Sequence, residues 1–176
     1  MNEILNEQLI YQGKICKLTH DEVTFENGKK GYRDVLHLSG AVVILAIDNE
    51  GRILFVSQYR HAVERQLLEL PAGMLEKDED PLDAARRELH EETGYWCGSI
   101  RHLTSFYSSP GVVKETLHLY LAEDLTMDHQ DLDPDEFIKV QALYPAEVEK
   151  ILAESDCVDG KTLLGYLFWK NMEKAR

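Results

Sequence analysis

Residues 73–95 read GMLEKDEDPLDAARRELHEETGY, and this stretch decides how the rest of the chain is interpreted. Asp80 is a suitable N-cap, Pro81 fits the first helical position, and Gly94 is a natural stop. We therefore predict a helix over residues 81–93. Its apolar stripe is predicted at positions with helical spacing, which are Leu82, Ala85 and Leu89.

The predicted helix carries three glutamates, Glu88, Glu91 and Glu92. Glu88 and Glu92 lie one turn apart and border the apolar stripe beside Ala85. Like charges at this spacing disfavour a helix, and more so when partly buried. Oxygen-rich clusters of this kind suit hard divalent cations, above all Mg²⁺. Taken alone, the three glutamates are more typical of a solvated acidic face.

The wider spacing favours the metal-binding interpretation. Gly73 is followed after five residues by Glu79, and after seven more by the run RELHEETGY at 87–95. This pattern resembles the Nudix box, and every fixed position matches; Tyr95 is an aromatic residue where an aliphatic one is usual. Seven fixed letters coincide by chance at roughly 10⁻⁹ per starting position.

The resemblance implies an α+β fold, the Nudix-type α/β/α sandwich with a mixed sheet, in which the box forms a loop, a helix and a loop. It implies that Glu88, Glu92 and the backbone carbonyl of Ala72 bind the metal. Glu91 matches a position that assists the metal cluster, and Arg87 one that orients a box carboxylate. We assign both to the catalytic group.

The flanking segments narrow the resemblance to ADP-ribose pyrophosphatases. Residues 58–60 (QYR) and 67–73 (LLELPAG) are similar to the segment before the box in that group. Pro110 matches its marker proline, sixteen residues after Gly94; alone it is more typical of an ordinary turn. The substrate-binding residues implied are Arg33, Arg60, Glu69, Met74, Ser109, Pro110, Gly111 and Glu115.

The same resemblance places a general base in an acidic loop predicted over residues 124–135, just before a strand that begins at Phe137. Box glutamates that hold a cation are poor proton acceptors. Glu136 is the glutamate nearest this point and is our choice for the base. Asp133 and Asp135 remain alternatives, and Glu136 could instead bind a metal.

Residues before the box carry the signals of an antiparallel sheet. Asn27-Gly28 predicts a two-residue hairpin turn that returns the chain into a strand at 32–38. The run at 41–47 predicts one buried strand. We expect residues 1–39 to form an N-terminal β-segment that takes part in dimerisation, and residues 40–176 to form the Nudix domain. The family resemblance implies the homodimer.

Composition excludes several classes of protein. The 176 residues contain 19 Lys and Arg against 32 Asp and Glu, a net charge of −13, so no nucleic-acid partner is expected. No apolar run approaches the roughly 20 residues of a membrane span. The acidic N-terminus predicts no export signal. The three cysteines lack metal spacing, which favours free thiols in the cytoplasm.

The predicted function is Mg²⁺-dependent hydrolysis of ADP-ribose to AMP and ribose 5-phosphate, with Mn²⁺ as an alternative cation. Two alternatives remain. The substrate could be another nucleoside diphosphate sugar or NADH, or the chain could be a sensor that binds ADP-ribose without turnover. The intact box and the lack of a basic extension disfavour the sensor.

Overall fold

Two units make up the computed structural model, which describes residues 3–132 and 137–174. One unit comprises the chain up to Gly40 together with Phe106–Leu117. The other comprises Ala41–Ser105 and the chain from His118 onward. The predicted general base Glu136 and its alternatives Asp133 and Asp135 lie outside the described residues.

The first unit is a small sheet built from two separate segments of the chain. Its strands follow the order β1-β2-β3-β9, with β1 (Glu3–Gln12), β2 (Lys17–Thr24), β3 (Lys30–His37) and β9 (Val113–Lys114). The first three pair antiparallel, whereas β9 runs parallel to β3. All ten residues of β1 are exposed.

The hairpin predicted at Asn27-Gly28 is present between β2 and β3, but its loop is longer than predicted. The Phe25 N–H donates to the Lys29 carbonyl at 2.8 Å, so the loop spans residues 26–28. Gly28 has a φ of 76°, in the left-handed region that glycine adopts without strain. The prediction of a two-residue turn was therefore wrong, because the left-handed glycine closes a three-residue loop.

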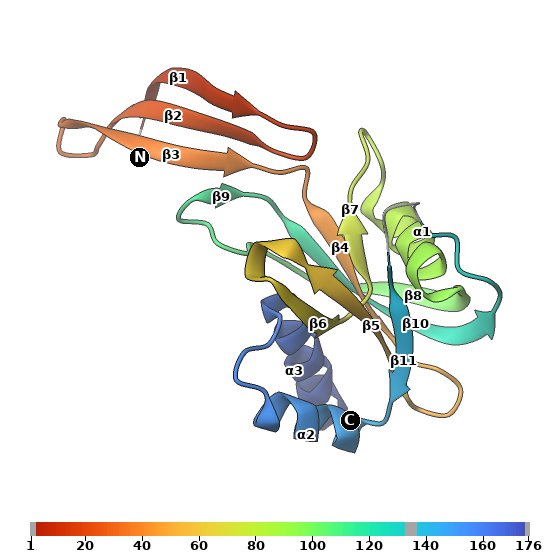
Figure 1. The fold of residues 1–176 in the computed structure, drawn as a ribbon. Helices are drawn as coiled ribbons and strands as arrows, with labels where there is room; N and C mark the ends of the chain where they lie inside the picture. Colours follow the sequence, from red (N-terminus) through yellow and green to blue (C-terminus); the bar gives the residue numbers. More distant parts are fainter. Residues whose placement is uncertain (1–2, 133–136, 175–176) are drawn as a thin grey trace. The chain divides into compact units, whose positions relative to one another are not determined.

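The second unit has two sheets, drawn in Figure 1. One follows the order β7-β4-β10-β8 and the other β11-β5-β6. The strands are β4 (Ala41–Ala46), β5 (Ile53–Arg60), β6 (Arg65–Glu69), β7 (Ala72–Met74), β8 (Tyr95–Phe106), β10 (Leu117–Met127) and β11 (Lys139–Leu143). A single 3-10 turn, His61–Val63, joins β5 to β6.

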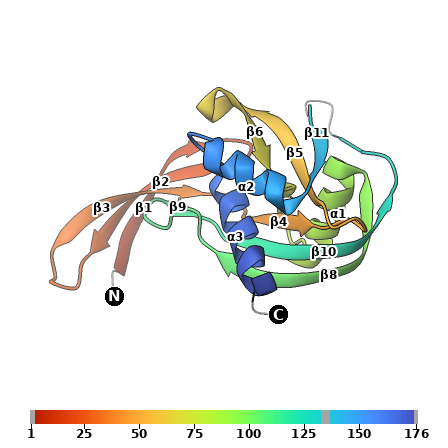
Figure 2. The ribbon, with the colours of Figure 1, turned by 90° about the horizontal axis from the view of Figure 1, so that it is seen from below.

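Helices cover the strands of this unit on two sides. Figures 1 and 2 show α1 (Pro81–Thr93) on one side of the strands, and α2 (Pro145–Glu154) with α3 (Gly160–Lys174) on the other. Strand β4 lies between these layers, and its residues 42–46 are fully buried. Such a strand reads as a continuous apolar run because both of its faces are covered. No helix of the described residues is long and apolar enough to cross a membrane.

Helix α1 has the boundaries that the sequence predicts. The Asp80 side chain accepts a hydrogen bond from the Leu82 N–H, and Gly94 ends the helix with a φ of 73°. The predicted stripe was partly wrong, because Leu82 is 37% exposed. Ala84 is buried instead, beside Ala85 and Leu89, so the helix packs through small residues and lies close to β4.

The sequence predictions were incomplete for the acidic loop and for two of the strands. The acidic loop was placed too early, because β10 continues through Asp124 to Met127. Strands β6 and β7 were not predicted.

The cysteines Cys16, Cys97 and Cys157 are free thiols, as the sequence analysis expected.

Candidate active site

The candidate active site is built where α1 packs against the short strand β7. A Cβ atom placed on Gly73 would lie 1.9–2.1 Å from the carboxylate atoms of Glu88. The Glu88 carboxylate therefore occupies the space that any other residue at position 73 would fill. This close approach explains why a glycine stands seven residues before the cap of α1.

Glu92 is held against the same strand one turn further along α1. Its side chain is buried, at 3% exposure, and Oε2 accepts a hydrogen bond of 2.9 Å from the Ala72 N–H. Glu88 and Glu92 thus present carboxylates beside Gly73 and Ala72 respectively. A buried carboxylate needs such partners, since burial disfavours its charged form.

Arg87 donates hydrogen bonds to three carboxylates of the box. Its Nε and Nη2 donate to both oxygens of Glu79 at 2.8 and 2.9 Å. Its Nη1 donates to Glu88 at 2.7 Å and to Glu91 at 2.9 Å. The hydrogen bond to Glu79 is the largest cause that raises the pKa of Arg87, and the same bond lowers the pKa of Glu79. Arg87 therefore fixes these carboxylates as a charged residue, and its Nη2 also reaches the Met74 carbonyl at 3.3 Å.

A short segment after β10 holds the C-terminal end of α1. The Asp128 N–H donates to the Gly94 carbonyl at 2.7 Å, and the Gln130 side chain donates to the Glu92 carbonyl at 2.6 Å. The Asp128 side chain accepts from Trp96, and hydrogen bonds from His129 and Trp96 lower its pKa to about 2. The last turn of the box helix is therefore tied to the chain that leads into residues 133–136.

The donor set fits a hard divalent cation. Glu88, Glu91, Glu92 and the Ala72 backbone supply only oxygen ligands, which Mg²⁺ prefers. The approach of Glu88 to Gly73 leaves room for no side chain other than that carboxylate. Within residues 3–132 and 137–174, no three acidic, histidine or cysteine side chains are grouped so that they could hold a metal ion by themselves. The Arg87 guanidinium neutralises part of the negative charge of these carboxylates, and a cation would neutralise more of it.

Two predicted substrate-binding residues, Arg60 and Glu69, form one ion pair. Arg60 donates to both oxygens of Glu69, at 2.8 and 2.9 Å. Glu69 is 1% exposed and also binds Lys161, which in turn lies 3.0 Å from Asp159. Burial alone would raise the pKa of Glu69, but Arg60 and Lys161 outweigh it, and the pKa is lowered.

Lys161 was missed by the sequence analysis. It lies at the start of α3, ninety-two positions after Glu69, so no local pattern connects the two residues. The available signal was Glu69 itself, because an acid within an apolar run requires a cationic partner when it is buried.

Among the other predicted substrate-binding residues, Met74 ends β7 in the second unit, and the rest belong to the first unit. The Arg33 guanidinium lies 4.8 Å from the centre of the Phe25 ring, and its Nη1 donates to the Tyr32 carbonyl at 2.8 Å. The Ser109 carbonyl accepts from the backbone N–H groups of residues 112 and 113, so Pro110 and Gly111 lie in a turn. Glu115 accepts a hydrogen bond from the Ser108 hydroxyl.

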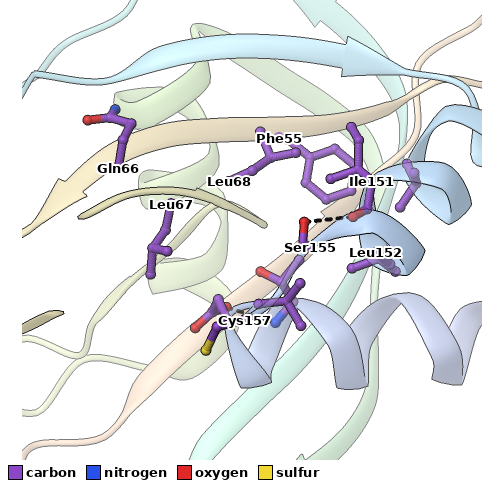
Figure 3. A pocket seen from close by; sticks show the side chains of 12 residues that line it. Phe55, Gln66, Leu67, Leu68, Ile151, Leu152, Ser155 and Cys157 are labelled. Atoms are coloured by element: carbon purple, nitrogen blue, oxygen red, sulfur yellow. Dashed lines mark hydrogen bonds between the residues drawn. The ribbon is translucent and has the colours of Figure 1, made fainter. Parts of the chain in front are cut away.

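A separate cavity of about 190 Å³ lies between β5 and β6 on one side and α2 and α3 on the other (Figure 3). Its lining includes Phe55, Leu68 and Ile151, with Cys157, Asp159 and Thr162 from the chain that enters α3. None of the box glutamates lines it. The cavity is therefore distinct from the carboxylate cluster at α1.

Comparisons with known proteins agree with this geometry. A model described as the NUDIX domain matches residues 37–159. The chain is 40% identical over 161 residues to the ADP-ribose pyrophosphatase of Bacillus subtilis (strain 168), which covers 90% of this chain and 86% of that protein. It is 39% identical over 171 residues to the methanol dehydrogenase activator of Bacillus methanolicus, covering 96% of this chain and 92% of that protein.

A crystal structure of an ADP compounds hydrolase has the same fold, with a TM-score of 0.86 at 19% identity. The match covers 99% of this chain and 95% of that one. The predicted α+β fold is thereby confirmed. The match to the NUDIX domain over residues 37–159 and the 40% identity to the Bacillus subtilis protein show that this chain belongs to the Nudix family.

Proposed function

We propose that the protein hydrolyses ADP-ribose to AMP and ribose 5-phosphate with the help of Mg²⁺. The observation that carries the proposal is the placement of Glu88 and Glu92 on successive turns of α1, against Gly73 and Ala72. The similarity to the Bacillus subtilis ADP-ribose pyrophosphatase supports the choice of substrate. In this reaction a water adds across the diphosphate, so that one phosphate leaves with the adenosine and the other with the ribose.

The residues of the box would have two roles, binding the cation and orienting its carboxylate ligands. Glu88, Glu92 and the Ala72 carbonyl would hold Mg²⁺, with Glu91 in support. A bound Mg²⁺ would neutralise these carboxylates and polarise the diphosphate oxygens. Arg87 keeps Glu88 and Glu91 oriented through its hydrogen bonds. Without a cation, an acidic site in a protein of net charge −13 would repel the substrate.

The remaining assignments are part of the same proposal. Arg33 and Arg60 would contact the nucleotide or the diphosphate, and Glu69, Met74, Ser109, Gly111 and Glu115 would line the substrate site. A homodimer formed through the N-terminal β-segment is supported by β1, where Ile4, Leu9 and Ile10 are more than half exposed. The three free thiols support a reducing, cytoplasmic location.

A hydrolysis panel with ADP-ribose, NADH, GDP-mannose and diadenosine polyphosphates tests the function. With Mg²⁺ present, we expect ADP-ribose to have the highest kcat/KM, and a chelator to abolish turnover. A higher kcat/KM for another compound would show that this compound, and not ADP-ribose, is the preferred substrate. Binding of ADP-ribose without turnover, with Mg²⁺ present, would identify a sensor.

Glu136 is proposed as the general base, on the family resemblance alone. The substitution Glu136→Gln should lower kcat by about 10²–10⁴-fold, because a positioned base contributes that factor. It should leave substrate and Mg²⁺ binding nearly unchanged and remove the acid limb of the pH–rate profile. The matched controls are Asp133→Asn and Asp135→Asn, measured over the same pH range. A wild-type kcat with an unchanged acid limb would exclude Glu136 as the base.

Pro110 is proposed to shape the substrate pocket through the turn in which it lies. The substitution Pro110→Ala relaxes the fixed φ of proline and should change the order of kcat/KM values across the panel. The Mg²⁺ concentration that gives half-maximal rate should stay the same, since no metal ligand is altered. Gly51→Ala, in an open turn elsewhere, is the control for a general loss of stability. An unchanged order of substrates would leave Pro110 as an ordinary turn residue.

A further inference from the structure

Leu70 and Pro71 connect the end of β6 at Glu69 to the start of β7 at Ala72, next to the expected metal site. Ala72 donates its N–H to Glu92, and its carbonyl is an expected metal ligand. The Pro71 carbonyl accepts from the Ile44 N–H of β4 at 2.8 Å. The two preceding residues, Glu69 and Leu70, are held by the first turns of α3.

Thr162 holds the backbone of this connection. Its hydroxyl accepts a hydrogen bond of 2.8 Å from the Leu70 N–H, and Thr162 is 2% exposed. A buried backbone N–H without a partner would destabilise the fold, so this bond fixes where Leu70 lies. The Thr162 N–H in turn donates to the Asp159 carboxylate at 2.9 Å, which fixes the start of α3.

Gly165 brings α3 close to the side chain of Leu70. A Cβ on Gly165 would lie 2.7 Å from Leu70 Cδ1, closer than carbon atoms approach in proteins. A glycine inside a helix is less favourable than an alanine. Its presence at this buried position is explained by the contact with Leu70, which is itself fully buried.

Lys161 completes the set of contacts through Glu69. Its ammonium group binds the buried Glu69 carboxylate, which also forms an ion pair with Arg60. One turn of α3 therefore supplies both a charge to Glu69 and a hydrogen-bond acceptor to Leu70. Neither Lys161 nor Thr162 belongs to the Nudix box.

We propose that the start of α3, through Thr162 and Lys161, positions the connection from Glu69 to Ala72 and thereby sets the affinity of the box for its cation. Thr162 and Lys161 are positioning residues, acting through Leu70 and Glu69. The proposal rests on the function proposed above, because it takes the Ala72 carbonyl and Glu92 as metal ligands.

The test is the binding of Mn²⁺ alone, measured by electron paramagnetic resonance on the full chain without substrate. Thr162→Val keeps the shape of the side chain but removes the acceptor for the Leu70 N–H. We expect its Mn²⁺ affinity to fall by about tenfold or more, the range found when groups that orient metal ligands are lost. Thr162→Ser should restore the affinity, because it restores the hydroxyl.

Tyr166→Phe is the matched control. It removes another hydroxyl of α3, one that donates to the Pro145 carbonyl at 3.1 Å and contacts Glu149 at 3.2 Å. The unfolding temperature should fall for this variant, but its Mn²⁺ affinity should equal that of the wild type. The control therefore separates a loss of stability in α3 from a loss of positioning.

Lys161→Met provides a second, independent variant should Thr162→Val not fold. It should also weaken Mn²⁺ binding, while the half-saturating Mg²⁺ concentration for turnover rises more than the KM for ADP-ribose. Wild-type Mn²⁺ affinity in a folded Thr162→Val or Lys161→Met variant would overturn the positioning role alone. Absence of Mn²⁺ binding by the wild-type protein would overturn the proposed metal site together with it.

Discussion

The substitution Glu92→Gln should reduce kcat by at least about 10²-fold while the protein stays folded. The glutamine keeps an oxygen that accepts the Ala72 N–H, so the contact between α1 and β7 survives. What disappears is the negative charge of a residue that is 3% exposed and expected to bind the cation. Loss of a fixed electrostatic contribution to the transition state has effects of this size.

The measurement is kcat for ADP-ribose across a range of Mg²⁺ concentrations, with thermal unfolding as the check on folding. Asp83→Asn is the matched control, because it removes one negative charge from an exposed position on the same helix. We expect Asp83→Asn to retain nearly full activity. A near-normal rate for Glu92→Gln at saturating Mg²⁺ would contradict the assignment of Glu92 as a metal ligand.

The substitution Gly73→Ala should be almost as damaging, although it adds only a methyl group. The new Cβ would fall within 2.1 Å of the Glu88 carboxylate, so Glu88 must leave its position beside β7. Displacement of a catalytic group by about 1 Å can lower a rate by about 10²-fold. We therefore expect kcat/KM for ADP-ribose to fall by about that factor.

A double-mutant cycle with Glu88→Ala tests whether the clash with Glu88 is the cause. If it is, Gly73→Ala should destabilise the wild-type protein but not the Glu88→Ala variant, as measured by the free energy of unfolding. Gly160→Ala, whose added Cβ meets no atom within 4 Å, serves as the control. Equal destabilisation in both backgrounds would show that the carboxylate of Glu88 is not the obstacle.

The helix of the box could be predicted from sequence because its determinants are local. Asp80, Pro81 and Gly94 act within one turn of the helix ends, and all three have the predicted roles. Strand β7 was not predicted because it is short and contains Gly73, and such a segment is a strand only through its pairing with β4. Sheet pairing of this kind depends on residues far away in the sequence.

The same distinction applies to the candidate site. The box spacing predicts that Glu88 and Glu92 lie on one side of the helix, because residues four positions apart are neighbours on its surface. The same spacing joins Arg87 to Glu91, which are hydrogen-bonded at 2.9 Å. The contacts of Lys161 and Thr162 with Glu69 and Leu70 span ninety-two positions and depend on how α3 packs. No local sequence pattern predicts how α3 packs against Glu69 and Leu70.

The two-segment construction of the first unit has a consequence for exchanging parts between relatives. Strand β9 belongs with β3: the Leu36 N–H donates to the Val112 carbonyl at 2.8 Å, and the Leu38 N–H to the Lys114 carbonyl at 3.1 Å. The turn that contains Pro110 is therefore part of the same small sheet as the N-terminal strands. A chimera that swaps only the chain up to Gly40 separates strands that pair in one sheet. Recombination that preserves this unit requires two further crossovers, one on each side of Phe106–Leu117. Under the role proposed for Pro110, such a chimera should take its substrate preference from the parent that supplies the N-terminal strands.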